Sequence, residues 1–461
     1  MKEMRILIVE DDKKTALSNQ PGILLDFAVF FAVSWIVIAL VSSPFFNVHW
    51  FVPGDFTYPE ANYYHAIMIP ALILFYILTI KVLHLDLTKG NAFAVAAMLS
   101  VLFAGVGSVF NASKEISVST IAQVIGMSMA ELLGLVLVAC MIKRYFGEHG
   151  REKERGVGFL LLLVSLSAIL VAGPLGHLAG WSIDIGTSSI PGLNTWLGAT
   201  KMSPQDFREG LVTSHSHLVM AALMSGLAAV AATYLHYQSR DALWSHISET
   251  GLWIVLVSLL AATGVYVSTA ITGWEPPVLF ASGQSGIPLD DVILTLQEIG
   301  FLVLAAGLFG PQRRHGPEPL SAMEKGVRNS IVTAWVTGFI GAVVLGVYIE
   351  MHEGLYGAGE APAARALNDN IFIRAHMLFP FLILPVLIAI TLAVGCRKKA
   401  VVSLLFRPGI FIWLSVVVML LGLTGEILWF TTRQGIVFVS SMVLMIPVFM
   451  VAAAVLWPLK K

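Results

Sequence analysis

Residues 64–83 have the sequence YHAIMIPALILFYILTIKVL, and stretches of this kind decide the fold. The stretch begins beside a histidine and has a lysine near its end, while almost every residue between them is apolar. A run of about 20 apolar residues is long enough for an α-helix to cross the ~30 Å hydrocarbon core of a bilayer. This stretch therefore predicts a transmembrane helix.

Similar apolar runs recur along the whole chain. Apolar residues make up 57% of the 461 residues and charged residues 12%, which is more apolar surface than a water-soluble chain of this length can bury. We predict an all-α polytopic membrane protein with about twelve transmembrane helices, at residues 24–44, 64–83, 92–111, 121–142, 157–176, 214–237, 250–270, 292–310, 330–349, 374–395, 408–429 and 435–457.

The charges of the loops predict the orientation of these helices. Lysine and arginine follow every even-numbered span, for example Lys81 after the second and Arg397 after the tenth, whereas the opposite loops carry mainly aspartate and glutamate. Cytoplasmic loops are enriched in basic residues. We therefore expect an inner-membrane protein with both termini in the cytoplasm. The net charge of −1 gives no reason to expect a nucleic-acid partner.

Residues 1–20 do not fit the membrane pattern. Met4-Arg-Ile-Leu-Ile-Val-Glu-Asp-Asp resembles the opening strand and acidic pair of a response-regulator receiver domain. A receiver needs a complete α/β domain, and here the chain enters the first predicted span instead. We interpret residues 1–20 as a cytoplasmic leader or tag-like segment and infer no phosphorelay function from it.

Histidines recur at equivalent places among the predicted spans. His65 opens the second span, His215 and His217 open the sixth, and His376 opens the tenth. Because these spans are four apart, the membrane domain, residues 21–461, divides into three four-helix repeats at about 24–155, 157–328 and 330–461. Such repeats predict pseudo-symmetry about an axis normal to the membrane. Another histidine ends each preceding span: His49, His177 and His352.

Histidine inside a membrane favours a functional reading. A buried imidazole is costly in hydrocarbon unless it has a partner, and a neutral imidazole is a good axial ligand for haem iron. The sequence contains no Cys-x-x-Cys-His motif, so we expect b-type haem. The alternative is that a histidine at a helix end bonds a loop carbonyl, which we favour for His49, His177 and His352.

The His-x-His pair suggests a family. Residues i and i+2 on a helix point about 200° apart, so His215 and His217 should address opposite sides of their helix. Val212-Thr-Ser-His-Ser-His-Leu-Val-Met resembles the His-x-His helix of haem-copper oxidase and nitric oxide reductase catalytic subunits. The resemblance implies twelve helices in three arcs, two b-type haems with histidine ligands, and a redox function in the respiratory chain.

The sequence departs from that family in two respects. The His-x-His pair lies on the sixth span instead of the tenth, and the seventh span, which would supply the ligand pair for copper or non-haem iron, contains no histidine. If the pattern is rotated by one repeat, His217 and His376 ligate one low-spin haem, and His215 and His65 ligate the other.

Other assignments remain open. His65 could instead face an open-sided haem as a distal base or copper ligand, or it could pair with His217. Arg374 lies beside His376, where it either contacts a haem propionate or anchors the helix at the interface. No catalytic residue is assigned. Among the intramembrane acids, Glu426 is the first candidate for a proton relay, ahead of Glu131 and Glu298, and the alternative is a carboxyl packed against a neighbouring helix.

The outer loops predict the redox partner. The longest, about 177–213 and 350–373, lie beside the histidine-bearing helices, and the outer loops are acidic, which favours a basic cytochrome c or a multihaem cytochrome subunit. A quinol is an alternative donor. Three classes of function follow: an electron-transfer haem protein or oxidoreductase, a haem- or copper-dependent gas-handling protein resembling the NnrS group, and a transporter without haem.

Overall fold

The computed structural model describes about half of the chain, comprising residues 22–42, 58–83, 85, 87, 90–110, 118–146, 156–184, 186, 189–235, 237–239, 241–273, 277–282 and 285–311. Residues 1–20 and the predicted spans nine to twelve lie outside the described residues. Arg374, His376 and Glu426 lie outside them too.

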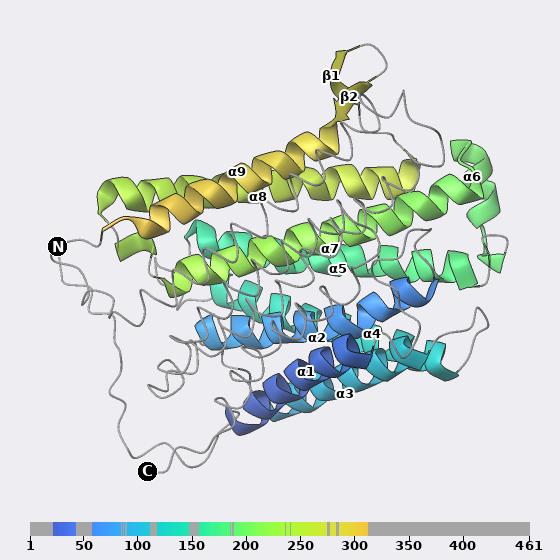
Figure 1. Ribbon diagram of the computed structural model, residues 1–461, viewed down its shortest axis with the longest axis horizontal. Helices are drawn as coiled ribbons and strands as arrows, with labels where there is room; N and C mark the ends of the chain where they lie inside the picture. The colour runs from blue at the N-terminus through green and yellow to red at the C-terminus, as the bar shows by residue number, and fades with distance from the viewer. Residues whose placement is uncertain are drawn as a thin grey trace, which may run out of the picture.

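The described chain is helical apart from one hairpin (Figure 1). Its elements are α1 Gly22–Ser42, α2 Tyr58–Leu83, α3 Gly90–Phe110, α4 Val118–Phe146, α5 Val157–Asp184, α6 Leu193–Thr200, α7 Pro204–Tyr234, the 3₁₀ turn η4 Tyr237–Ser239, α8 Ala242–Thr272, β1 Val278–Ser282, β2 Ser285–Pro288 and α9 Leu289–Phe309. Every one of the first eight predicted spans coincides with a helix. Among the described residues, seven helices are long and apolar enough to cross a membrane, and α1 contains a shorter apolar stretch. The protein is thus a multi-pass membrane protein.

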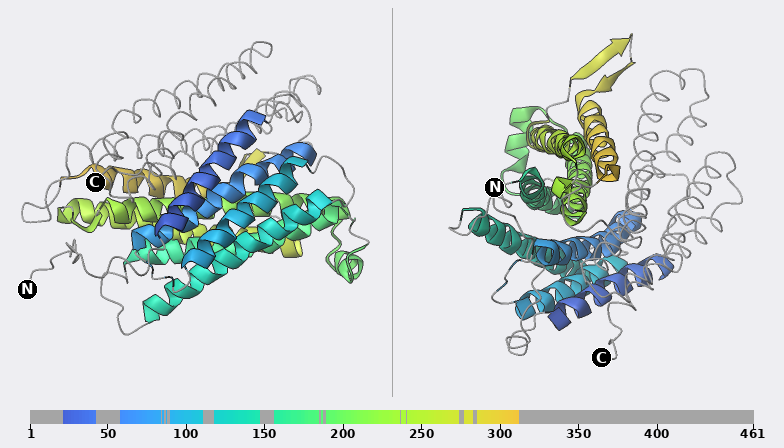
Figure 2. Two further views of the ribbon diagram at one scale, coloured as in Figure 1. Left: turned by 90° about the horizontal axis from the view of Figure 1, so that it is seen from below. Right: turned by 90° about the vertical axis from the view of Figure 1, so that its left-hand side faces the viewer.

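The long helices pack as two groups of four. In the first group, α1 contacts α2 and α3, α2 contacts α3 and α4, and α3 contacts α4. In the second group, α5, α7, α8 and α9 make the same pairings in the same order. Figures 1 and 2 show the blue and cyan helices of the first group beside the green and yellow helices of the second.

A short sequence is shared by the last helix of each group. Gln123-Val-Ile-Gly126 lies in α4, and Gln297-Glu-Ile-Gly300 lies in α9. A Cβ on Gly126 would overlap the backbone nitrogen of Ala104 in α3, and a Cβ on Gly300 would lie 2.7 Å from Val255 Cγ2 in α8. Glycine permits this close approach of helix backbones. Both groups therefore bring their third and fourth helices together in the same way.

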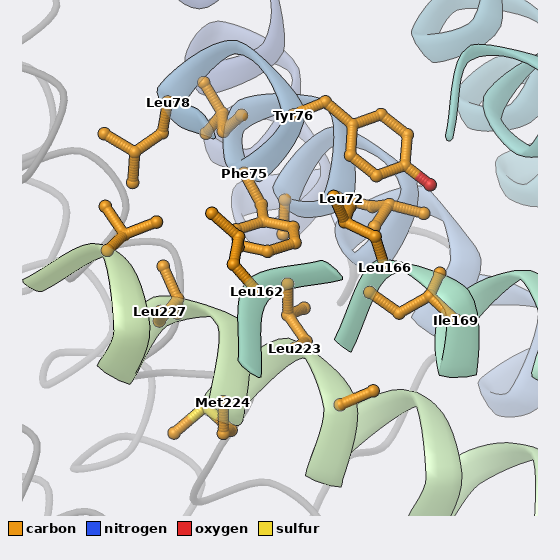
Figure 3. Close-up of a cluster of buried hydrophobic side chains, with 14 of the residues drawn as sticks. Leu72, Phe75, Tyr76, Leu78, Leu162, Leu166, Ile169, Leu223, Met224 and Leu227 are labelled. Atoms are coloured by element: carbon orange, nitrogen blue, oxygen red, sulfur yellow. The ribbon is translucent and has the colours of Figure 1, made fainter. Parts of the chain in front are cut away.

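The two groups are joined mainly by α4 with α5 and by α2 with α7. Phe75 of α2 packs against Gly226 of α7, where no Cβ could be accommodated without displacing the ring. Figure 3 shows Phe75 beside the side chains of Leu162 in α5 and of Leu223 and Leu227 in α7. This joint is closely packed and apolar, so it fixes how α2 and α7 meet.

The sixth predicted span begins too late. The sequence places it at 214–237, but α7 starts at Pro204, because the Ser203 side chain caps the helix by accepting a hydrogen bond from the Asp206 backbone N–H at 3.1 Å. The first turns of α7 are polar and amphipathic, so an apolar-run criterion misses them. His215 consequently lies about 16 Å along its helix and does not open it. His65 likewise lies two turns inside α2, which begins at Tyr58.

The predicted 177–213 loop is also largely helical. It contains the end of α5, the short helix α6 and the first turns of α7. Leu193 and Leu197 of α6 are buried in a small cluster with Phe207 and Leu211 of α7, so α6 covers this end of the second group. Between α8 and α9 the chain forms the antiparallel β1–β2 hairpin, with Leu279 opposite Ile287.

Candidate functional site

The structure brings together two of the histidines predicted to bind haem. His65 of α2 and His215 of α7 have ring centroids 6.3 Å apart, with their planes inclined by 31°. Two imidazoles that share one metal ion, each at a metal–nitrogen distance of about 2 Å, have centroids roughly 6 Å apart. The spacing of this pair is therefore suited to two axial ligands of one iron.

His215 is held firmly by α5. Its Nδ1 lies 2.8 Å from the carbonyl oxygen of Ala172, and its ring lies against Gly176, where a Cβ would be 2.5 Å from Cε1. A carbonyl can only accept, so Nδ1 must carry the proton and Nε2 must hold the lone pair. A metal-binding histidine usually has this kind of second hydrogen bond, because it sets the tautomer and the orientation of the ring.

His65 is half-buried and has a weaker contact with its own group. Its Nδ1 lies 3.5 Å from Nε2 of Gln123 in α4. An amide can present either its NH₂ or its oxygen to the ring, so this contact is compatible with both tautomers of His65.

His217 faces a different neighbour. Its ring stacks on Tyr266 of α8 at a centroid distance of 5.5 Å, and its Nδ1 donates to the carbonyl of Thr213 in its own helix at 3.0 Å. His215 and His217 thus address different sides of α7, as their spacing predicts. Of the two, His215 is the one whose ring lies beside His65. The predicted partner of His217, His376, lies outside the described residues.

His177 has a partner that the sequence did not predict. We expected a loop carbonyl, but Nε2 of His177 lies 2.9 Å from Oε1 of Glu131 in α4, as an ion-pair contact and not a well-aligned hydrogen bond. The Glu131 carboxyl lies against Gly173 of α5, where a Cβ would displace it. The signal available in the sequence was an acid in the middle of an apolar span, which requires a partner on a neighbouring helix.

The surroundings of His65 and His215 suit a haem. On a helix, residues three and seven positions further on share the face of the first residue. At those positions α2 has Met68 and Leu72, and α7 has Leu218 and Ala222, all buried and apolar. A haem macrocycle requires an apolar lining and axial ligands from facing helices. Here the residues at these positions are apolar, and an imidazole from α2 lies beside one from α7.

A metal site made of protein ligands alone is not evident in this part of the chain. Within the described residues, no group of three or more histidine, cysteine, aspartate or glutamate side chains is arranged to hold a metal ion. No family model, no curated protein and no solved structure matches the sequence.

Proposed function

We propose that this chain is a membrane haem b protein that transfers electrons, resembling the catalytic subunits of haem-copper oxidases, with His65 and His215 as axial ligands of one haem. The main support is the 6.3 Å spacing of the two rings, together with the backbone hydrogen bond that leaves Nε2 of His215 available to a metal. A haem bound here would supply reversible one-electron chemistry.

Each element around the site has a role in this proposal. Ala172 holds the His215 ring in one tautomer, Gly176 makes room for that ring, and Gln123 restrains His65. The apolar residues on α2 and α7 exclude water from the site. Because the ligands come from different four-helix groups, the iron would also bind the two groups to each other.

We further propose that the complete chain has twelve transmembrane helices in three repeats. The identical helix pairings of the two described groups and their shared Gln-x-Ile-Gly sequence support the first two repeats. In this arrangement His217 and His376 ligate a second haem, and Arg374 lies near one of its propionates. The charges of the loops support an orientation with both termini in the cytoplasm and the histidines in the outer half of the membrane.

The proposed electron partner docks on the outer face. The outer loops are acidic in sequence, and the partly buried Asp290 and Asp291 lie in the first turn of α9 beside the hairpin. Acidic surfaces attract basic partners such as a cytochrome c or a multihaem cytochrome subunit. Electron exchange with a basic cytochrome should slow several-fold between low and high salt. An exchange rate that is independent of salt would indicate a neutral donor such as a quinol.

Visible spectra of the purified protein test the proposal. We expect a dithionite-reduced spectrum and a pyridine haemochrome of b-type. His65→Ala and His215→Ala should lose the same haem, while His217→Ala and His376→Ala should lose the other. His246→Ala, at an exposed position near the start of α8, is the matched control and should keep both.

Several outcomes would contradict the proposal. A colourless protein produced in haem-replete cells would favour a transporter, and stoichiometric copper without haem would favour a gas-handling copper protein. Loss of a single common haem in all four histidine variants would reject the pairing of His65 with His215, because it would show one site and not two.

A further inference from the structure

The Glu131–His177 pair is not used by the proposed haem site. Glu131 and His177 lie on α4 and α5, where the two groups meet, and both side chains are more than two thirds buried. The pair also lies within electrostatic range of His215. Ionisable groups in a membrane interior are costly, and they commonly mark proton pathways.

A third polar group lies one helical turn further along. The hydroxyl of Tyr76 in α2 is completely buried and has no hydrogen-bond partner. It lies against Gly134 of α4, where a Cβ would be 2.5 Å from the oxygen. Gly134 is three residues after Glu131, a rise of about 4.5 Å. Figure 3 shows the Tyr76 hydroxyl pointing away from the cluster around Phe75.

The register of α2 and α4 places these groups in a line. His65 meets Gln123, and eleven residues later Tyr76 meets Gly134, so α2 and α4 run parallel without slipping past each other. α5 runs in the opposite direction, because Gly173 meets Glu131 while Leu170 meets the next turn at Gly134. From the His65 end inward, the order is therefore His177, Glu131 and Tyr76.

A second polar group, the backbone carbonyl of Leu170 in α5, belongs to a residue whose side chain lies beside Gly134. Pro174 lies inside α5 and has no N–H to donate to the carbonyl of Leu170. The Leu170 side chain reaches the same point as the Tyr76 hydroxyl. A buried hydroxyl without a partner is costly, and a buried water is the usual way in which such groups are satisfied.

We propose that Glu131 and His177 form a buried proton-binding pair, and that Tyr76 connects it to the interior of the first group through a water at Gly134. A proton moves between Nε2 of His177 and Oε1 of Glu131 without changing the net charge of the pair. A second proton, received from the Tyr76 side, gives an imidazolium beside a neutral carboxylic acid. The Tyr76 oxygen passes on its own proton and takes one from the next water, so no charge remains on it.

The neighbouring helices contribute few other ionisable groups. At the level of the pair, the ionisable side chains of α2 and α7 are His65, Tyr76 and His215, and the other charged residues of these helices lie elsewhere along them. α3 has no ionisable side chain between residues 90 and 110. On α8, Tyr266 stacks on His217. The proposal does not depend on haem, because the pair and Tyr76 are in place without it.

Infrared difference spectroscopy of the whole purified protein tests the pair. A pH change should produce a carboxylic acid C=O band that shifts in D₂O. Glu131→Gln should remove the band, whereas Glu298→Gln, which changes the intramembrane acid of the other group, should leave it. In His177→Gln the band should change frequency, because the Glu131 carboxyl loses the imidazole that lies 2.9 Å from it.

The connection to Tyr76 has its own readout. Tyr76→Phe should shift the frequency of the Glu131 band and slow its exchange in D₂O several-fold, while Tyr266→Phe should change neither. Glu131→Gln is isosteric, and unchanged elution on size-exclusion chromatography will confirm that it folds. A band that persists in Glu131→Gln would overturn the pair, and a band that is unaffected by Tyr76→Phe would overturn the connection. If the purified protein contains no haem but still shows this band with the expected effects of the variants, only the proposed function is rejected and the proton-binding pair stands.

Discussion

The glutamine of the shared Gln-x-Ile-Gly sequence has different partners in the two four-helix groups. In α9, the Gln297 amide donates to the carbonyl of Ala221 at 2.9 Å and to the hydroxyl of Ser225 at 2.6 Å, both on α7. In α4, Gln123 reaches α2 but meets the imidazole of His65. The partners of Gln297 cannot change their charge in the physiological range, whereas the partner of Gln123 can.

The intramembrane acids of the two groups, Glu131 and Glu298, also have different surroundings. Glu131 of α4 faces the joint between the groups, where it meets His177. Glu298 of α9 follows Gln297 in a helix that packs mainly on α8. A repeated helix packing is thus kept while the intramembrane acid lies at the joint between the groups in one case and within its own group in the other.

The largest expected effect concerns the close helix contacts that the groups share. Gly126→Ala places a Cβ on the backbone of Ala104, which cannot rotate away, and should destabilise the protein by about 3 kcal/mol or more. In Gly300→Ala the nearest atom is the Val255 side-chain Cγ2 at 2.7 Å and the nearest backbone atom is 3.0 Å away, so the substitution should cost less. Gly264→Ala, with nothing within 4 Å, is the control. Melting temperatures in detergent measure all three, and equal losses at Gly126 and Gly300 would contradict the prediction.

A second pair of variants on α5 tests whether this helix positions the His215 ring for haem binding. Gly176→Ala puts a Cβ 2.5 Å from the His215 ring, so the ring must move away from the Ala172 carbonyl. We expect loss of haem from this site and a destabilisation of about 1–3 kcal/mol. Gly180→Ala, one turn further along the same helix, meets nothing within 4 Å and should retain the haem. Equal haem content in the two variants would argue against His215 as a ligand.

Substitutions of the two glutamines should differ in their effects on stability and on the haem. Gln297→Ala removes a buried amide and two hydrogen bonds, and it should cost about 1–3 kcal/mol with no change in the haem spectrum. Gln123→Ala breaks one long contact, and it should change the spectrum or potential of the His65 haem with a smaller loss of stability. Melting curves measure the loss of stability, and redox titrations measure the effect on the haem. A haem effect in Gln297→Ala, or a larger loss of stability in Gln123→Ala, would contradict the contrast between the groups.

The smallest effect is expected at an ion pair near the end of α2. Lys81 pairs with Asp26 of α1, and both side chains are partly exposed. Partly exposed ion pairs contribute about 0–1 kcal/mol, because solvent screens them and the long side chain loses entropy. Lys81→Met should therefore lower the melting temperature less than Gln297→Ala does. A larger loss would show that this end of the first group depends on charge as much as on packing.

The sequence by itself determined the class of the protein and the positions of its first eight spans, because apolar length is a local property of the chain. It also determined that His215 and His217 point to different sides of α7, since the rotation between i and i+2 is fixed by the helix. It missed the start of α7, because polar residues in the first turns conceal a helix that extends beyond its apolar part.

Only the tertiary structure decided which ionisable groups meet. His65 lies beside His215, and Glu131 lies beside His177, because helix rotation, depth and the glycines at positions 173 and 176 bring these side chains to the same level. None of these quantities is local in the sequence. The same holds for Tyr76, which in the sequence is one more apolar residue in a span. Its hydroxyl becomes a candidate for proton transfer only when α4 presents Gly134 to it.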